Sequence, residues 1–170
     1  MAIKKTKLSL KEDSDYTILG ISCHLSDFRF IHYVNKIKYF NFTRHGDFDY
    51  QFKKDGEIFY FPLYYFDDHE NYISFYIVSN RSEDGILMNE WRNFDFLLIT
   101  KNKISNEKMK TINSDIKKIT GVLAVTQLIS SKKSEIENLL SEIEIYVTEY
   151  LVQSKKEQNK FLLKNQGYEA

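Results

Sequence analysis

The sequence has few of the residues that crosslink, kink or loosen a chain. It contains one cysteine (Cys23), one proline (Pro62) and six glycines among 170 residues. One cysteine excludes an intrachain disulfide, and no run approaches the roughly 18 uncharged apolar residues of a membrane-spanning helix. The first eleven residues have the positive charge of a signal peptide without its apolar core. We therefore expect a cytoplasmic protein that has no membrane partner.

The motifs of common enzyme classes are missing as well. There is no glycine-rich phosphate loop and no strand-turn-helix nucleophile elbow. Cys23 and His24 are neighbours, but adjacent side chains of a strand point to opposite faces and cannot form a thiol–imidazole pair. The four histidines show no metal-ligand spacing: His24, His32, His45 and His69. We expect no metal and no cofactor, and an enzyme only through residues that folding brings together.

The net charge is zero, with 24 basic and 24 acidic side chains. Six lysines nevertheless lie within residues 101–118: Lys101, Lys103, Lys108, Lys110, Lys117 and Lys118. Combined with aromatic side chains exposed on a sheet, such a group could bind RNA. A solvated helix face is the more ordinary interpretation, so nucleic acid is the alternative partner and not the favoured one.

Aromatic side chains are concentrated early in the chain. Of the 26 Phe, Tyr and Trp residues, 22 precede residue 101, which predicts that most of a sheet lies there. Apolar periodicity and turn residues predict strands at 16–24, 40–52, 57–66, 72–79, 94–100 and 122–129. They predict helices at 27–39, from a Ser105 cap to Gly121, and from a capping box at Ser134 and Glu137 to 153.

Three local signals refine this prediction. Gly20 indicates a bulge or a close approach of backbone, and Asp55-Gly56 indicates a hairpin turn at 53–56. Pro62 interrupts a strand and removes a ladder donor, which favours an edge position.

The resulting order is β-α-β-β-β-β-α-β-α. We predict an α+β fold with a mostly antiparallel sheet of about six strands and with the helices packed on one face. A ferredoxin-like sheet with an inserted hairpin is one such arrangement. Residues 1–153 form a single domain that includes an amphipathic C-terminal helix, and 154–170 form a frayed helical or disordered tail.

Residues 80–99 join two apolar strands and contain the only tryptophan. Within this segment, residues 88–96 resemble a diverged copy of the motif that names the IPExxxVDY family of bacterial proteins. Glu90 and Asp95 keep their spacing, whereas Met88, Asn89, Phe94 and Phe96 replace the Ile, Pro, Val and Tyr. Residues 19–25, 77–82 and 97–99 are similar to family members too. The resemblance implies a small cytoplasmic domain and points to these motif and flanking residues: Asn80, Arg81, Glu90, Phe94, Asp95 and Phe96.

A structural role is expected for this motif. Asp95 lies between Phe94 and Phe96 at the start of a strand, so we expect it to point away from both rings. Its carboxylate should accept hydrogen bonds from backbone groups of 80–90, from Arg81 or from Arg92, which would brace the connection.

The leading functional hypothesis is a non-catalytic accessory or protein-interaction module. It rests on balanced charge, the aromatic-rich sheet and the long C-terminal helix, which could pack against a protein partner or form a homodimer. One alternative is an RNA-associated factor. Another is a small-molecule or enzymatic site near Glu90 and Asp95, which requires both carboxylates to line one pocket.

Overall fold

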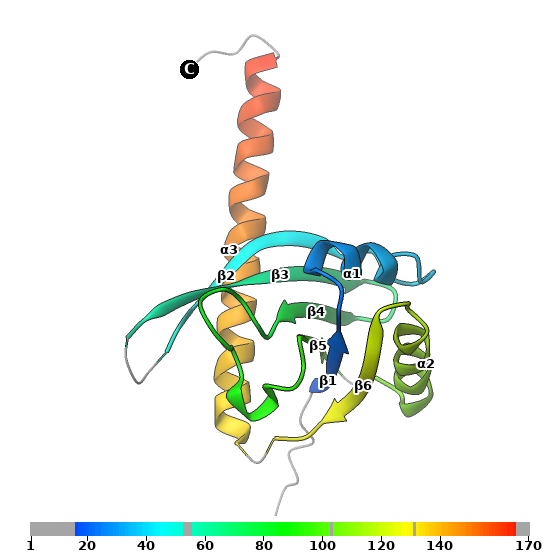
Figure 1. The fold of residues 1–170 in the computed structure, drawn as a ribbon. Helices are drawn as coiled ribbons and strands as arrows, with labels where there is room; N and C mark the ends of the chain where they lie inside the picture. The colour runs from blue at the N-terminus through cyan, green and yellow to red at the C-terminus, as the bar shows by residue number, and fades with distance from the viewer. Residues whose placement is uncertain (1–15, 53–55, 103, 131, 166–170) are drawn as a thin grey trace, which may run out of the picture.

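The computed structural model describes residues 16–52, 56–102, 104–130 and 132–165, with side chains through residue 160. Within these ranges the chain forms an α+β fold in the predicted element order, with one added 3₁₀ turn (Figure 1). The strands are β1 (Tyr16–Cys23), β2 (Thr43–Gln51), β3 (Ile58–Asp68), β4 (Ile73–Ser79), β5 (Phe96–Lys101) and β6 (Val122–Leu128). The helices are α1 (Asp27–Val34), the 3₁₀ turn η1 (Asn89–Trp91), α2 (Asn106–Lys117) and α3 (Lys133–Asn165).

The six described strands form one sheet in the order β2-β3-β4-β5-β1-β6, and every neighbouring pair is antiparallel. β5 and β6 flank β1, so they run parallel to each other and are joined through α2. The strands β4-β5-β1-β6 with α1 and α2 have the β-α-β-β-α-β arrangement of a ferredoxin-like sheet. The hairpin β2–β3 is inserted at the edge beside β4.

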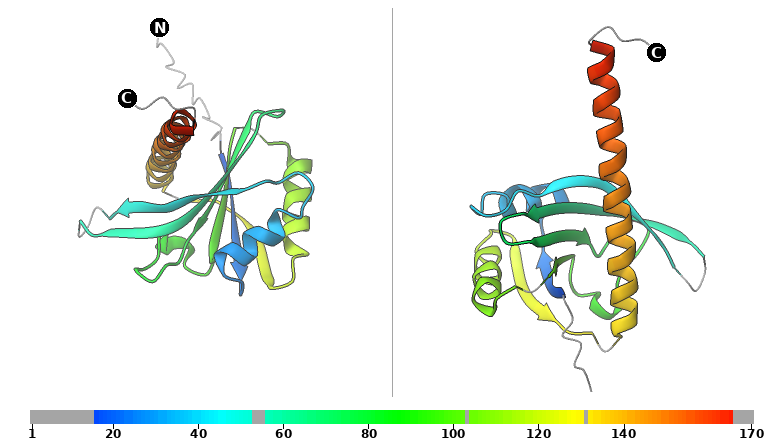
Figure 2. Two further views of the ribbon diagram at one scale, coloured as in Figure 1. Left: turned by 90° about the horizontal axis from the view of Figure 1, so that it is seen from above. Right: turned by 180° about the vertical axis from the view of Figure 1, so that it is seen from behind.

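Helices cover both faces of the sheet, which corrects the expectation that all of them pack on one face. α1 and α2 bury their apolar stripes against Ile21 and Leu98, whereas α3 packs against the opposite face with Ile18 and Leu97. Figure 2 shows α3 on one side of the sheet and the two shorter helices on the other. The central strands β4 and β5 carry buried apolar side chains on both faces of the sheet. Helices must therefore cover both faces.

Two helix boundaries differ from their predicted positions. α1 ends at Val34 instead of residue 39, because the Asn35 amide donates to the Phe42 carbonyl (2.9 Å) and accepts from the Phe42 N–H (2.8 Å). α3 begins at Lys133, so Ser134 lies inside the first turn and does not form the expected capping box. The Ser105 cap on α2 is confirmed, since its hydroxyl accepts from the Lys108 N–H at 3.2 Å.

Pro62 lies where β3 pairs with β2 on one side and with no strand on the other, so the predicted edge position is confirmed locally although β3 is interior further along. It pairs with Asp47 of β2, where the β2–β3 register shifts, while the β3–β4 ladder ends at Leu63. The Tyr60 N–H donates to the Asp84 carboxylate at 3.0 Å. Backbone N–H groups two residues apart point to the same side of a strand. The Pro62 nitrogen therefore points to the same side as the Tyr60 N–H, where β4 no longer pairs with β3. The proline therefore removes no ladder hydrogen bond.

The predicted hairpin turn lies largely outside the described residues, apart from Gly56. The Gly56 N–H donates to the Phe52 carbonyl at 2.9 Å, and Gly56 has a φ of +69°, in the left-handed region.

α3 is by far the longest helix in the described ranges and extends well past the sheet (Figure 1). Its 33 residues correspond to about 50 Å of helix. It continues beyond Gln153, where the predicted tail begins, and residues 166–170 of that tail lie outside the described residues. Among the helices of the described ranges, none combines the length and apolarity needed to cross a membrane.

Candidate functional site

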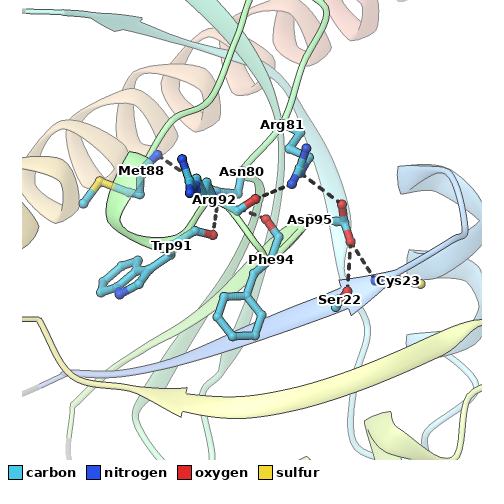
Figure 3. Close-up of polar contacts among 9 residues, drawn as sticks. All are labelled: Ser22, Cys23, Asn80, Arg81, Met88, Trp91, Arg92, Phe94 and Asp95. Atoms are coloured by element: carbon cyan, nitrogen blue, oxygen red, sulfur yellow. Dashed lines mark hydrogen bonds and ion pairs between the residues drawn. The ribbon is translucent and has the colours of Figure 1, made fainter.

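The segment between β4 and β5 folds around the side chain of Asn80, which is completely buried. The Asn80 amide nitrogen donates to the carbonyls of Trp91 (2.9 Å) and Phe94 (3.0 Å), and its oxygen accepts from the Met88 N–H at 2.8 Å. Figure 3 shows these bonds converging on one side chain from η1 and from the turn that follows it. A single amide thus satisfies three backbone groups of the segment.

The backbone of Asn80 is also paired on both sides. Its N–H donates to the Asp95 carbonyl (2.8 Å), and its carbonyl accepts from the Leu87 N–H (3.0 Å). Every hydrogen-bonding group of this residue is therefore used to hold residues 87–95. Buried polar groups are stable only when they are paired in this way, so Asn80 fixes the conformation of the connection.

Asp95 ties the start of β5 to the end of β1. Its Oδ2 atom accepts from the Cys23 N–H at 2.8 Å and lies 3.5 Å from the Ser22 hydroxyl, while Oδ1 lies 3.3 Å from Arg81 Nε (Figure 3). The Arg81 guanidinium also donates to the Arg92 carbonyl. Arg81 is thus a partner of Asp95, as expected, but the backbone donor comes from β1 and not from residues 80–90. The carboxylate braces two strands and one loop.

The two phenylalanines beside Asp95 lie on opposite faces of the sheet, which corrects the expectation that both point away from it together. β5 begins only at Phe96, so the alternation of a strand does not reach Phe94. Phe96 is buried beside α1 and stacks on Phe30 with ring centroids 4.7 Å apart. Phe94 lies over Gly20, where an added Cβ would be 2.7 Å from the ring. Gly20 is thus approached closely by side chains, not by backbone as predicted, and the register shift of β1 lies at Ser22 and Cys23.

Glu90 lies apart from this network. It belongs to η1, accepts a hydrogen bond from the Ser130 hydroxyl at 2.8 Å, and lines a cleft together with Tyr50, Lys132 and other residues. Asp95 lines a different cleft on the far side of the segment. The two motif carboxylates therefore do not line one pocket, as the hypothesis of a site near both of them requires.

The cleft beside Asp95 has a volume of about 590 Å³ and lies between the start of α1, β2 and the tip of the 80–85 segment. Its lining contains two arginines and five acids: Asp27, Arg44, Asp47, Arg81, Glu83, Asp84 and Asp95. Arg44 pairs with Asp47 (2.5 Å) and Asp27 (3.6 Å), and Arg81 pairs with Asp95. Both arginines are thus engaged by carboxylates of the same cleft.

Two titratable groups of this region are held in their neutral forms. Burial raises the pKa of the Cys23 thiol by more than the hydrogen bond from the Leu25 N–H lowers it, and the nearby Asp95 charge adds a smaller increase. Burial and the hydrogen bond that the Tyr64 hydroxyl donates to Asp27 (2.8 Å) raise the pKa of Tyr64. A thiol is a nucleophile only as the thiolate, so Cys23 is poorly suited to covalent chemistry near neutral pH.

The lysines considered for RNA binding are partly engaged by acids. Lys101 pairs with Glu144 (2.5 Å), Lys108 with Asp68 (3.0 Å) and Lys118 with Asp115 (2.9 Å). Lys103 lies outside the described residues. In the part of the chain that the structure describes, no group of three or more His, Cys, Asp or Glu side chains could hold a metal ion.

The residues around Asn80 do not predict its central role, because its partners are backbone groups, which every residue has. Only the family resemblance pointed to this residue. The salt-bridge partners Arg44 and Asp27 were not anticipated either, because β2 and α1 meet at this cleft only after folding.

Comparison with protein-family models, with curated proteins and with solved structures finds no match for this chain.

Proposed function

We propose that this protein is a non-catalytic cytoplasmic accessory protein, a protein-interaction module that binds its partner through α3. The observation that carries the proposal is the distal part of α3, residues 151–165, which continues the helix after its apolar stripe has left the sheet.

The proximal part of α3, residues 133–150, is a conventional packed helix. Ile136, Leu139, Ile143 and Val147 are buried against the sheet. From Leu151 onward the described side chains are exposed apart from the half-buried Ser154. Leu151 and Val152 keep 38% and 46% of their surface exposed. Most helical stability in proteins comes from packing of an apolar face, so a solvent-exposed extension of this length favours a binding partner.

The extension leaves the domain in a fixed direction because α3 is anchored to β2. The Tyr146 hydroxyl donates to the Asp47 carbonyl at 3.0 Å, and the ring of Tyr150 lies against His45 with centroids 4.8 Å apart. Gly46 has a φ of +74°, and an added Cβ there would lie 2.8 Å from the Tyr146 hydroxyl. This close contact holds the helix on β2 up to Tyr150, so residues beyond it are presented on a rigid support.

Two features of the motif region support a structural role instead of a catalytic one. Glu90 and Asp95 line separate clefts, and the Cys23 thiol is neutral. The hydrogen-bonding groups of Asn80 and Asp95 are used to join strands, as a brace requires.

The proposal includes membership of the IPExxxVDY family, carried by the resemblance of residues 88–96. Phe96 takes the place of the motif tyrosine and is buried against Phe30, where a hydroxyl is dispensable for packing. A bracing role for the motif is compatible with that replacement, and with Asn89 in place of the proline. A bacterial origin follows from this part of the proposal.

The test is affinity purification of the tagged, full-length protein from native cytoplasm, with partners identified by mass spectrometry. We expect stoichiometric recovery of one protein, and its loss when Leu151→Glu and Val152→Glu are combined. Ile58→Glu is the matched control, because Ile58 is as exposed as these residues but lies on β3. Recovery of the protein alone and monomeric, or capture that the double variant leaves unchanged, would overturn the proposal. Recovery of RNA that is released steeply by salt would favour the nucleic-acid alternative.

A further inference from the structure

We infer that the partner of α3 is α3 of a second copy of this chain, bound antiparallel across a two-fold axis near Thr148. The inference rests on the proposed function and names its partner. It is carried by an uncharged stripe on the outer face of the helix and by a reversal of charge along its length.

The outer face of α3 has a stripe at alternating spacings of three and four residues. Its members are exposed, and they lie on the side of the helix opposite the buried stripe: Asn138, Ser141, Ile145, Thr148 and Val152. Ile145 exposes 59% of its surface. A shallow groove of the surface follows the middle of this stripe. The spacing is that of a helix–helix seam, in which one face packs along a neighbouring helix.

The two hydroxyl groups of the stripe need no partner from outside the helix. Ser141 donates to the Glu137 carbonyl at 2.9 Å, and Thr148 donates to the Glu144 carbonyl at 2.8 Å. Packing another helix here would therefore bury methyl and methylene groups without leaving these donors unpaired. The stripe is suited to close contact between helices.

The charge of α3 reverses near its middle. Residues 133–150 contain one lysine and five glutamates, a net charge of 1 − 5 = −4. Residues 151–165 contain four lysines and one glutamate, a net charge of 4 − 1 = +3. Two copies placed parallel would set like charges side by side, whereas two antiparallel copies set the basic half of each against the acidic half of the other. The proximal half stays net acidic although Lys101 pairs with Glu144 and Lys132 pairs with Glu135. Charge complementarity therefore selects the antiparallel pair.

An axis near Thr148 also aligns the apolar members of the stripe. It places Val152 of each copy beside the Ile145–Thr148 part of the other, and it brings Lys155 and Lys156 next to the acidic proximal half. Residues 133–163 of each helix, or about 46 Å, then lie side by side. Among the described elements, α3 shares its side of the sheet only with the segment around η1, which packs with its buried stripe (Figure 2). The outer face of α3 is exposed and therefore open to a second helix.

The experiment is sedimentation of the purified full-length protein over a range of concentrations. We expect a dimer for the natural sequence and a monomer when Ile145→Glu and Val152→Glu are combined. Leu123→Glu is the control, because Leu123 is 57% exposed on the free edge strand β6, and this variant should remain dimeric. Thermal unfolding by circular dichroism establishes that each variant is folded. A monomer at every concentration, or a dimer that persists in the double variant, overturns the inference.

Orientation is tested by disulfide crosslinking of two single-cysteine additions, with Cys23 left buried as it is. Thr148→Cys lies at the axis and should crosslink to itself on mild oxidation, whereas Asn159→Cys should not. Equal crosslinking at both positions would indicate a parallel pair and overturn the inference. A monomeric pure protein that captures a different protein through Leu151 and Val152 would overturn this inference and leave the proposed function standing.

Discussion

The carboxylate of Asp95 accepts a hydrogen bond from the N–H of Cys23, a residue 72 positions earlier in the chain, at 2.8 Å. The same carboxylate pairs with Arg81, which in turn holds the Arg92 carbonyl. One side chain therefore connects the end of β1, the start of β5 and the loop between β4 and β5. Asp95, an acid of the 88–96 motif, thus holds together segments that are far apart in the sequence.

Replacing Asp95 should weaken the fold without abolishing it. Asp95→Ala leaves the Cys23 N–H without its acceptor and Arg81 without its counter-charge. We expect the free energy of unfolding to fall by about 1–3 kcal/mol. Urea denaturation measures the change, and Glu70→Ala, at an exposed acid in the β3–β4 turn, is the control that should have no effect beyond error. An unchanged midpoint for Asp95→Ala would contradict the bracing role.

Asn80 should be the more sensitive position of the two. Asn80→Ala leaves the Met88 N–H and the carbonyls of Trp91 and Phe94 unpaired in a fully buried place, so we expect a loss of about 3 kcal/mol or more. Asn80→Asp keeps the size of the side chain but replaces its donor NH₂ group with a carboxylate oxygen that faces the Trp91 and Phe94 carbonyls. This variant should be no better tolerated than Asn80→Ala. Chemical denaturation with tryptophan fluorescence reports on both, since Trp91 is the only tryptophan. A loss smaller than that of Asp95→Ala would be inconsistent with this ranking.

Even the smallest side chain at position 20 should lower the stability of the protein. A Cβ there would lie 2.7 Å from the Phe94 ring and 2.8 Å from Leu128, so Gly20→Ala must push one of them away. We expect a cost of about 1–3 kcal/mol, the range for overpacked cores.

A second substitution tests that cause. Phe94→Leu shortens the obstructing side chain, so the double variant Gly20→Ala with Phe94→Leu should lose less stability than the sum of the single variants. Additive losses, measured by thermal or urea unfolding, would show that the Phe94 ring is not the obstacle.

His45 should make stability fall on mild acidification. Its ring is buried between Tyr65 and Tyr150, its Nδ1 atom has no hydrogen-bond partner among the described residues, and burial lowers its pKa below 6.5. Between the lowered folded-state pKa and 6.5, the unfolded chain binds a proton that the folded protein does not. The contribution to stability is therefore complete above pH 6.5 and decreases as the pH falls through this window.

The pH dependence assigned to His45 can be isolated by substitution. His45→Phe keeps the ring contacts and cannot bind a proton, so the melting temperature of this variant should lose less between pH 7 and pH 5 than that of the natural protein. His32→Gln, at an exposed position of α1, should leave the profile unchanged. Identical pH profiles for His45→Phe and the natural protein would refute the assignment.

Much of the fold can be predicted from this sequence, because most strands and helices have a clear local pattern of apolar residues. Aromatic runs such as residues 59–66 and the 3.6-residue spacing of Met109, Ile112 and Ile116 identify their elements directly. The predicted ends of elements are wrong where a side chain bonds backbone outside its own element. The hydrogen bonds between the Asn35 side chain and the Phe42 backbone end α1, and apolar periodicity cannot predict them.

The placement of α3 and the centre of the candidate site required the structure. Strands that are apolar at nearly every position do not reveal which face a given helix will cover, so the second layer was missed. The partners of Asn80 are main-chain groups at positions 88, 91 and 94, which carry no residue-specific signature. Arg81 could be placed beside Asp95 because both lie in the segment that connects β4 to β5, whereas Arg44 and Asp27 reach the same cleft from elements far away in the chain.

The position of α3 in the chain has a consequence for biosynthesis. Every described strand precedes this helix, so a nascent chain can complete this sheet and bury one face under α1 and α2 while the residues of α3 are still inside the ribosome. The other face, with Phe61, Val78, Leu97 and Ile99, is covered only by the segment around Trp91 until α3 emerges. Exposed apolar surface of this kind promotes aggregation and chaperone binding. The emergence of α3 is therefore the step that covers this surface and protects the newly made domain from self-aggregation.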